Sequence, residues 1–214
     1  MKAKTMGKVT VTLFLMLMVS LFLTSCSGVV TPELQLDLDE ALNKVEEIDS
    51  VYLDVPYEKY AGYNWCLPAS GAMAFRYFGE NITQAEIAKE VIKDGISSVY
   101  KMITYAKDLG FEAKYNYMTI DEIKEILKED TPVIAIQNYS PTLPYSHARV
   151  VTGYDDEKQE VITNDPTAGE DYIIAYSDFT ALNAGSNPDL FKVIIISTEE
   201  IDTKNELANS ANNS

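Results

Sequence analysis

Cys66, His147 and Asp165 are the residues of this chain whose types and order suit nucleophilic catalysis. His147 is the only histidine, and Cys66 is the only cysteine outside the N-terminal segment. A cysteine attacks as its thiolate, so it needs a base that takes its proton and an acceptor that orients this base. All three residue types follow in the order Cys, His, Asp, which indicates a nucleophilic active site.

The sequence around each residue suits this role. Cys66 lies where a loop is predicted to turn into a helix, and a helix N-terminus favours thiolate over thiol. His147 opens an apolar run, 147–154, that is typical of a strand. Each residue also has a purely structural interpretation. A lone cysteine is usually an inert buried thiol, a strand histidine can simply be hydrogen-bonded in place, and Asp165 before Pro166 is a common turn starter.

Helices are predicted to fill the first half of the domain. The first runs from Cys66 to about Phe78 and is stopped by Gly79. Capping boxes that begin at Thr83 and Thr119 start two further helices. In the helix after Thr83, one apolar face is formed by Ile87, Ala88, Val91 and Ile92. A fourth helix is predicted from 99 to 109, ended by Gly110.

The second half is predicted to be mostly strand. The predicted strands cover residues 111–117, 132–137, 147–154, 160–163, 172–175 and 190–196, with a polar hairpin loop at 155–158 and a short helix at 177–182. Helices followed by an antiparallel sheet predict an α+β fold. The length of the predicted folded region, 51–198, fits one domain.

The first 25 residues predict an export signal peptide. Lys2, Lys4 and Lys8 precede an uncharged, mostly apolar run, 9–23, that is short for a spanning helix. A transmembrane anchor is the alternative. The residues Leu23-Thr24-Ser25-Cys26 resemble the lipobox of bacterial lipoproteins, in which cleavage leaves an acylated cysteine as the new N-terminus. The resemblance implies lipid attachment at Cys26, which would hold the exported protein on the extracytoplasmic face of the cell membrane.

Outside the domain, residues 26–50 are predicted to be a lipidated N-terminus and tether that could include a short helix at 37–48, and 199–214 a disordered polar tail. The net charge of −16 argues against nucleic acid as a partner. One histidine and one non-lipidated cysteine do not suit a transition-metal site, so no metal or other cofactor is predicted. The sequence does not indicate an oligomeric state.

Two sequence blocks resemble the peptidase C39-like family. The first contains Val55-Pro56-Tyr57, Cys66-Leu67-Pro68-Ala69-Ser70, Met73, Tyr77, Gly79 and Ile82-Thr83-Gln84, and the second contains His147, Val150-Val151-Thr152-Gly153-Tyr154-Asp155 and Asn164-Asp165-Pro166. The resemblance covers roughly 51–196. It implies a papain-like fold and a peptide or protein substrate. It also implies that Cys66 is the nucleophile, that His147 is the general base, and that Asp165 holds the imidazole in its productive tautomer.

The chain departs from the family pattern at two positions. Leu67 replaces a glycine, and Tyr60 stands where the family has a glutamine whose amide stabilises the oxyanion. Such a donor contributes about 3–4 kcal/mol in the transition state, and the Tyr60 hydroxyl, Asn64 or Gln137 could replace it. We therefore expect a membrane-anchored cysteine peptidase or amide hydrolase. The alternatives are a catalytically weak or inactive peptide-binding module on the same fold and, less favoured, an acyl transferase.

Overall fold

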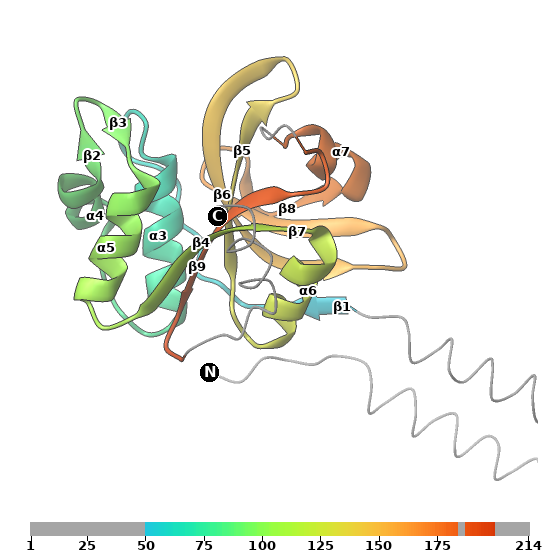
Figure 1. Cartoon of the computed structure of the whole chain (residues 1–214), viewed down its shortest axis with the longest axis horizontal. Helices are drawn as coiled ribbons and strands as arrows, with labels where there is room; N and C mark the ends of the chain where they lie inside the picture. The colour runs from blue at the N-terminus through green and yellow to red at the C-terminus, as the bar shows by residue number, and fades with distance from the viewer. Residues whose placement is uncertain (1–49, 184–186, 200–214) are drawn as a thin grey trace, which may run out of the picture.

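Three helices lie beside a large antiparallel sheet in the computed structural model, which describes residues 50–183 and 187–199 (Figure 1). The predicted signal peptide, the lipid attachment at Cys26 with its tether, and nearly all of the polar tail lie outside these residues. None of the described helices is long and apolar enough to cross a bilayer. Most helical residues precede most of the strands, so the predicted α+β order is confirmed.

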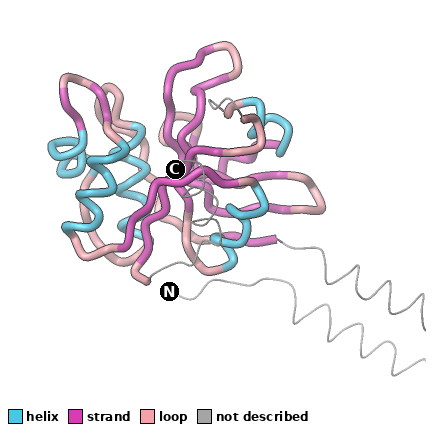
Figure 2. Tube along the Cα trace, in the orientation of Figure 1, coloured by secondary structure: helices cyan, strands magenta, loops and turns pink. Residues whose placement is uncertain are grey.

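The helical half is formed by α3 (Cys66–Tyr77), α4 (Gln84–Val91) and α5 (Val99–Asp108), which gather on one side of the molecule (Figure 2). α3 is buried along most of its length. Its Gly71 lies against α5, because a Cβ at Gly71 would be 2.6 Å from Met102 Cε. α4 begins at the predicted capping box, in which Thr83 and Glu86 each accept a hydrogen bond from the other's backbone N–H. Local sequence and close packing therefore fix the helices together.

The sheet has the strand order β4-β9-β5-β6-β7-β8, with antiparallel neighbours. These strands are β4 (Glu112–Met118), β5 (Val133–Ser140), β6 (Leu143–Asp155), β7 (Glu160–Asp165), β8 (Gly169–Ala175) and β9 (Phe191–Ser197). Two further helices, α6 (Ile120–Lys128) and α7 (Tyr176–Ala181), lie on the side away from α3 (Figure 1). The 13-residue β6 pairs first with β5 and then with β7, so it connects both parts of the sheet.

A short first strand, β1 (Ser50–Tyr52), pairs with the last residues of β6. Gly153 permits this pairing, because a Cβ there would lie only 2.2 Å from the carbonyl oxygen of Val51. The contact continues past the strand, where the N–H of Leu53 donates to the carbonyl of Thr152 at 2.7 Å. The sequence did not predict β1, since three residues are too few to show a strand periodicity.

A hairpin of two short strands, β2 (Ile92–Lys93) and β3 (Ile96–Ser97), follows α4. The prediction that Ile92 belongs to the apolar face of the helix after Thr83 is therefore wrong, because Ile92 begins β2. The helix ends at Val91, because Asp94 and Gly95 adopt positive φ angles of 53° and 77° and form a tight turn. This hairpin projects from the helical half (Figure 1).

A second projecting hairpin is formed by the end of β5 and the start of β6 (Figure 1). β5 continues to Ser140, although the sequence predicts its end at 137. β6 begins at Leu143, although the sequence predicts its start at 147. The first four residues of β6 are exposed, so no alternation of buried and exposed positions marks them as strand. The two hairpins flank the end of the molecule at which α3 begins (Figure 1).

Candidate active site

Cys66 is the first residue of α3 and follows a sharp turn. The N–H of Trp65 donates to the carbonyl of Gly62 at 3.2 Å, and Asn64 has a positive φ of 60°. The Trp65 ring packs directly on Gly62, because a Cβ at Gly62 would lie 2.4 Å from the indole. The turn therefore places Cys66 at the helix N-terminus, as the sequence predicted.

Among the described residues, no side chain caps this end of α3. Pro68 occupies the first turn, where a missing N–H costs nothing. The backbone N–H groups of Leu67 and Ala148 instead donate to the Cys66 sulfur. Burial raises the pKa of the Cys66 thiol, but the hydrogen bond and charge of His147, together with these N–H groups, outweigh burial and lower the pKa. The thiolate is therefore favoured at this position.

His147 lies on β6 and is almost completely buried, with 4% of its surface exposed. Its Nε2 atom lies 2.9 Å from Oδ1 of Asp165. Because Nε2 is bonded to Asp165, the hydrogen bond with Cys66 is made by the other ring nitrogen, Nδ1. Burial lowers the pKa of His147, but the hydrogen bonds with Asp165 and Cys66 outweigh it, so the pKa is raised. The imidazole is thus placed to exchange a proton with the thiol.

Asp165 ends β7 and is buried. Its carboxylate accepts hydrogen bonds from His147 Nε2, from Arg149 Nε at 3.0 Å, and from the backbone N–H groups of Thr167 and Ala168 at 2.8 and 3.1 Å. Burial raises the pKa of this carboxyl, but the hydrogen bond and charge of His147 and the charge of Arg149 hold it well below its usual range. Asp165 is therefore a fixed anion at neutral pH.

Arg149 is a site residue that the sequence analysis missed. It lies two residues after His147 on the same face of β6, and only 2% of its surface is exposed. Its Nη1 donates to Oε1 of Gln137, whose own amide donates to the carbonyl of Phe179 at 2.8 Å. Gln137 is completely buried and does not line the cleft at Cys66, so of the three alternatives for an oxyanion donor it is the one whose side chain cannot reach a substrate there.

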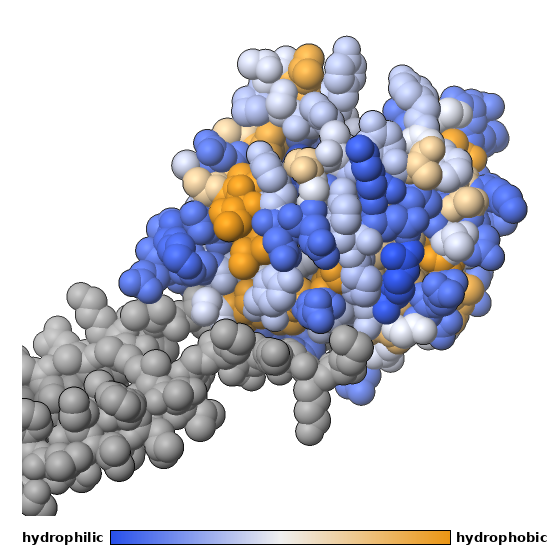
Figure 3. Space-filling model, turned by 180° about the vertical axis from the view of Figure 1, so that it is seen from behind, coloured by the Kyte–Doolittle hydropathy of each residue, from blue (hydrophilic) through white to orange (hydrophobic). Residues whose placement is uncertain are grey.

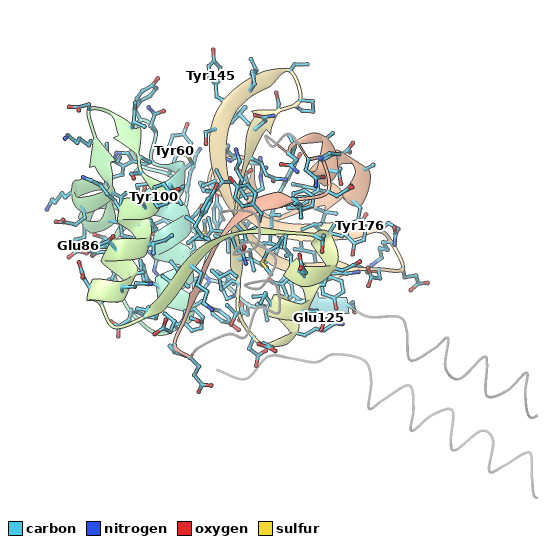
Figure 4. All side chains as sticks on the ribbon, in the orientation of Figure 1. Tyr60, Glu86, Tyr100, Glu125, Tyr145 and Tyr176 are labelled. Atoms are coloured by element: carbon cyan, nitrogen blue, oxygen red, sulfur yellow. The ribbon has the colours of Figure 1, made fainter. Side chains whose placement is uncertain are left out.

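A cleft of about 640 Å³ opens above Cys66 and His147. Tyr60 and Asn64, the other two predicted oxyanion donors, both line it. The N–H of Tyr60 donates to the carbonyl of Pro166 at 3.3 Å, which ties its loop to the turn after Asp165. Figure 4 shows Tyr60 between the helical half and the β5–β6 hairpin, with Tyr145 above it on that hairpin.

The Asn64 side chain is hydrogen-bonded to the β2–β3 hairpin. Its amide nitrogen donates to the carbonyl of Gly95 at 2.9 Å, and the Ser97 hydroxyl donates to the backbone carbonyl of Asn64 at 3.0 Å. These bonds hold the hairpin against the turn that precedes Cys66. Within the described residues, the Tyr60 hydroxyl has no such partner, so it is the more available of the two donors.

The model of the Peptidase_C39 like family matches residues 52–184, which is more than half of the chain. A search of curated proteins found no match.

Solved structures share the fold at low sequence identity. A double glycine motif protease from an AMS/PCAT transporter, solved with a leader peptide, is 21% identical with a TM-score of 0.53, covering 68% of this chain and 93% of that one. The peptidase domain of Streptococcus ComA is 18% identical, TM-score 0.54, over 66% and 97% of the two chains. Xylellain, a cysteine protease from Xylella fastidiosa, is 16% identical, TM-score 0.51, over 74% and 89%. The predicted papain-like α+β fold is confirmed.

Proposed function

Because the chain belongs to the Peptidase_C39 like family, we propose that it is a cysteine peptidase or a related amide hydrolase that acts on a peptide. The observation that carries the proposal is the hydrogen-bonded series Cys66–His147–Asp165 at an open cleft. The transporter protease of similar fold was solved with a leader peptide, which supports a peptide as the substrate class here.

In the proposed mechanism, the Cys66 thiolate attacks the carbonyl carbon of the scissile bond. The C–N bond breaks, and Nδ1–H of His147 protonates the departing amine. Water then attacks the thioester, His147 takes the proton of this water, and the carboxylic acid leaves while the Cys66 sulfur is restored. Asp165 accepts from Nε2–H throughout, which keeps the imidazole oriented and favours its protonated form.

The negative oxygen that forms during attack needs hydrogen-bond donors. We assign this role to the backbone N–H of Cys66, at the uncapped start of α3, and to the Tyr60 hydroxyl in the same cleft. Tyr60 is 39% exposed, so a substrate can reach it. A tyrosine at a position where the family has glutamine is also the observation that favours the alternative function, a peptide-binding module with little or no turnover.

The location proposed for the enzyme follows from its N-terminal sequence. We propose that it is exported and held by acyl chains on Cys26 at the extracytoplasmic face of the membrane, as the lipobox-like residues Leu23-Thr24-Ser25-Cys26 suggest. No partner beyond its substrate and this membrane is proposed.

The test is digestion of a broad peptide library, with cleavage products identified by mass spectrometry and Cys66→Ala as the inactive control. Wild type should cleave in a Cys66-dependent manner, and Tyr60→Phe should lose about 100-fold or more in kcat, because only the donor hydroxyl is removed. Tyr60→Gln replaces one donor with another and should retain activity.

A different result would favour the binding module. Wild type and Tyr60→Gln would both leave the library uncleaved, while wild type and Cys66→Ala would bind a library peptide with the same affinity. An active Tyr60→Phe variant would keep the enzyme but remove the oxyanion role of Tyr60.

A further inference from the structure

The cleft at Cys66 collects exposed hydrophobic side chains. Of the twelve large hydrophobic residues that are exposed in the described part of the chain, half line this one cleft: Tyr60, Tyr63, Ile96, Tyr139, Leu143 and Tyr145. Over the rest of the face seen in Figure 3, below the upper edge of the molecule, the surface is largely hydrophilic, with hydrophobic residues scattered over it. An exposed hydrophobic cluster around a reactive group indicates a binding surface for an apolar ligand.

Apart from the reactive pair Cys66 and His147, the described residues place no charged side chain in the lining of this cleft. None of its lining residues is Asp, Glu, Lys or Arg, although these types make up 23% of the chain. A charged side chain bound here would lose water and gain no opposite charge in return, which costs free energy. The cleft therefore selects against charged residues near the scissile bond.

Four of these six hydrophobic residues lie on two hairpins that form opposite walls of the cleft, while Tyr60 and Tyr63 lie in the loop before Cys66. Ile96 lies on the β2–β3 hairpin, and Tyr139, Leu143 and Tyr145 lie on the β5–β6 hairpin. In Figure 3 the upper edge of the molecule is notched between two projections, which lie where Figure 1 places the hairpins. A ligand that reaches Cys66 passes between the two walls and can contact both.

Both walls are fixed to the site. Asn64, next to the nucleophile turn, is bonded to Gly95 and Ser97 of the β2–β3 hairpin. On the other wall, the Tyr139 ring packs edge-on against the His147 imidazole, with the ring centres 5.3 Å apart. Since the walls are positioned by the same residues that position the reactive groups, their spacing is set relative to Cys66.

We propose that the substrate is an uncharged peptide segment with an aromatic or large aliphatic side chain beside the scissile bond, held between the β2–β3 and β5–β6 hairpins. This substrate class rests on the proposed function, because it places the scissile bond at Cys66. A volume of about 640 Å³ suits a short segment of a few residues. Tyrosine walls provide large apolar contact area with hydroxyls left for the peptide backbone.

The test measures binding without catalysis. Trp65, the only tryptophan of the chain, lines the cleft, so its fluorescence reports occupancy of this site. The full chain carrying Cys66→Ala is titrated with acetyl-Ala-Ala-Phe-Ala-amide and with acetyl-Ala-Ala-Asp-Ala-amide. We expect the Phe peptide to bind at least about tenfold more tightly, a typical discrimination for one apolar pocket contact.

Three variants in the same background locate the contact. Ile96→Ser and Tyr145→Ser change exposed residues on the two walls and should each lower the preference for the Phe peptide severalfold. Tyr172→Ser is the matched control, because Tyr172 is exposed on β8 and does not line the cleft. Equal affinity for both peptides, or an unchanged preference in both wall variants, would overturn the proposal.

The two proposals fail separately. If the Phe peptide binds selectively but Cys66 of the wild type does not react with iodoacetamide in the folded protein, the cleft stands as a binding site for apolar peptide segments and the enzyme does not. If Cys66 reacts as an activated thiolate and the peptides bind equally, the enzyme stands and the substrate class is wrong.

Discussion

Replacement of Arg149 by methionine should remove about 3–5 kcal/mol from the free energy of unfolding. Arg149 and Asp165 form a buried ion pair in which each side chain is only 3% exposed. Methionine fills much of the same volume but leaves the Asp165 carboxylate without its permanent cation. It also leaves the buried Oε1 of Gln137 without its donor. The cost of a broken buried ion pair is large because the remaining charge keeps its desolvation penalty.

The assay is urea unfolding at pH 7, followed by Trp65 fluorescence. The pKa of Asp165 is lowered in the folded protein, so its stabilising contribution is present above its unfolded pKa of about 3.9 and is lost as pH falls through the folded value. Neutral pH therefore measures the full effect. With an m-value of roughly 2 kcal/mol/M, the midpoint should fall by about 1.5–2.5 M.

Three comparison variants make the reasoning refutable. Arg149→Lys keeps the charge but cannot hold Asp165 and Gln137 together, so its free energy of unfolding should lie between those of wild type and Arg149→Met. Lys128→Met removes an exposed ion pair with Glu125 and should cost no more than about 1 kcal/mol. The double variant Arg149→Met with Asp165→Asn should lose less free energy of unfolding than the two single variants lose together.

An additive double variant, or an Arg149→Met protein as stable as Lys128→Met, would show that the buried pair does not have the role assigned to it. The substitution should also act on the site. Arg149 lowers the pKa of His147 through its charge, so methionine should raise that pKa further.

Three further predictions follow from the site and its surroundings. Cys66 should react with iodoacetamide with a midpoint below the ordinary thiol pKa of about 8.5, and in His147→Ala the midpoint should rise above wild type, because burial raises this pKa and His147 lowers it; equal midpoints would contradict the pairing. Gly153→Ala should cost about 1–3 kcal/mol in thermal or urea unfolding, because its Cβ meets the carbonyl oxygen of Val51; unchanged stability would mean that β1 does not pair as described. Wild type should incorporate labelled palmitate in a bacterial host and Cys26→Ala should not, and equal labelling would remove the proposed anchor.

The helices and the place of Cys66 at a helix start were predictable because their signals are local. Thr83 and Thr119 begin capping boxes whose partners lie three residues away, and both boxes form as expected. Cys66 lies at the start of its helix as predicted, because the Pro68 that follows is favourable in a first turn. Such features depend only on neighbouring residues, so a single sequence is enough to find them.

The missed features depend on contacts between distant residues. Arg149 lies in an apolar strand, and its partners Asp165 and Gln137 are separated from it in sequence, so only the register of β5, β6 and β7 brings them together. One missed element did have a local signal. The pair Asp94-Gly95 is a common two-residue hairpin turn, but the apolar spacing of Ile92 favours the preceding helix, whereas Ile92 pairs with Ser97 in the hairpin.

The helix that carries Cys66 lacks one stabilising interaction that helices commonly have, a side-chain cap at the N-terminus. A capping side chain in place of Trp65 would contribute about 1 kcal/mol, whereas Trp65 offers no cap and none of the other residues that the structure describes supplies one. An aspartate there would stabilise the helix, yet it would place a negative charge beside the sulfur and disfavour the thiolate. Stability and reactivity thus make opposite demands on one residue, and a search for more stable variants of this protein would be drawn to the substitution that harms the nucleophile.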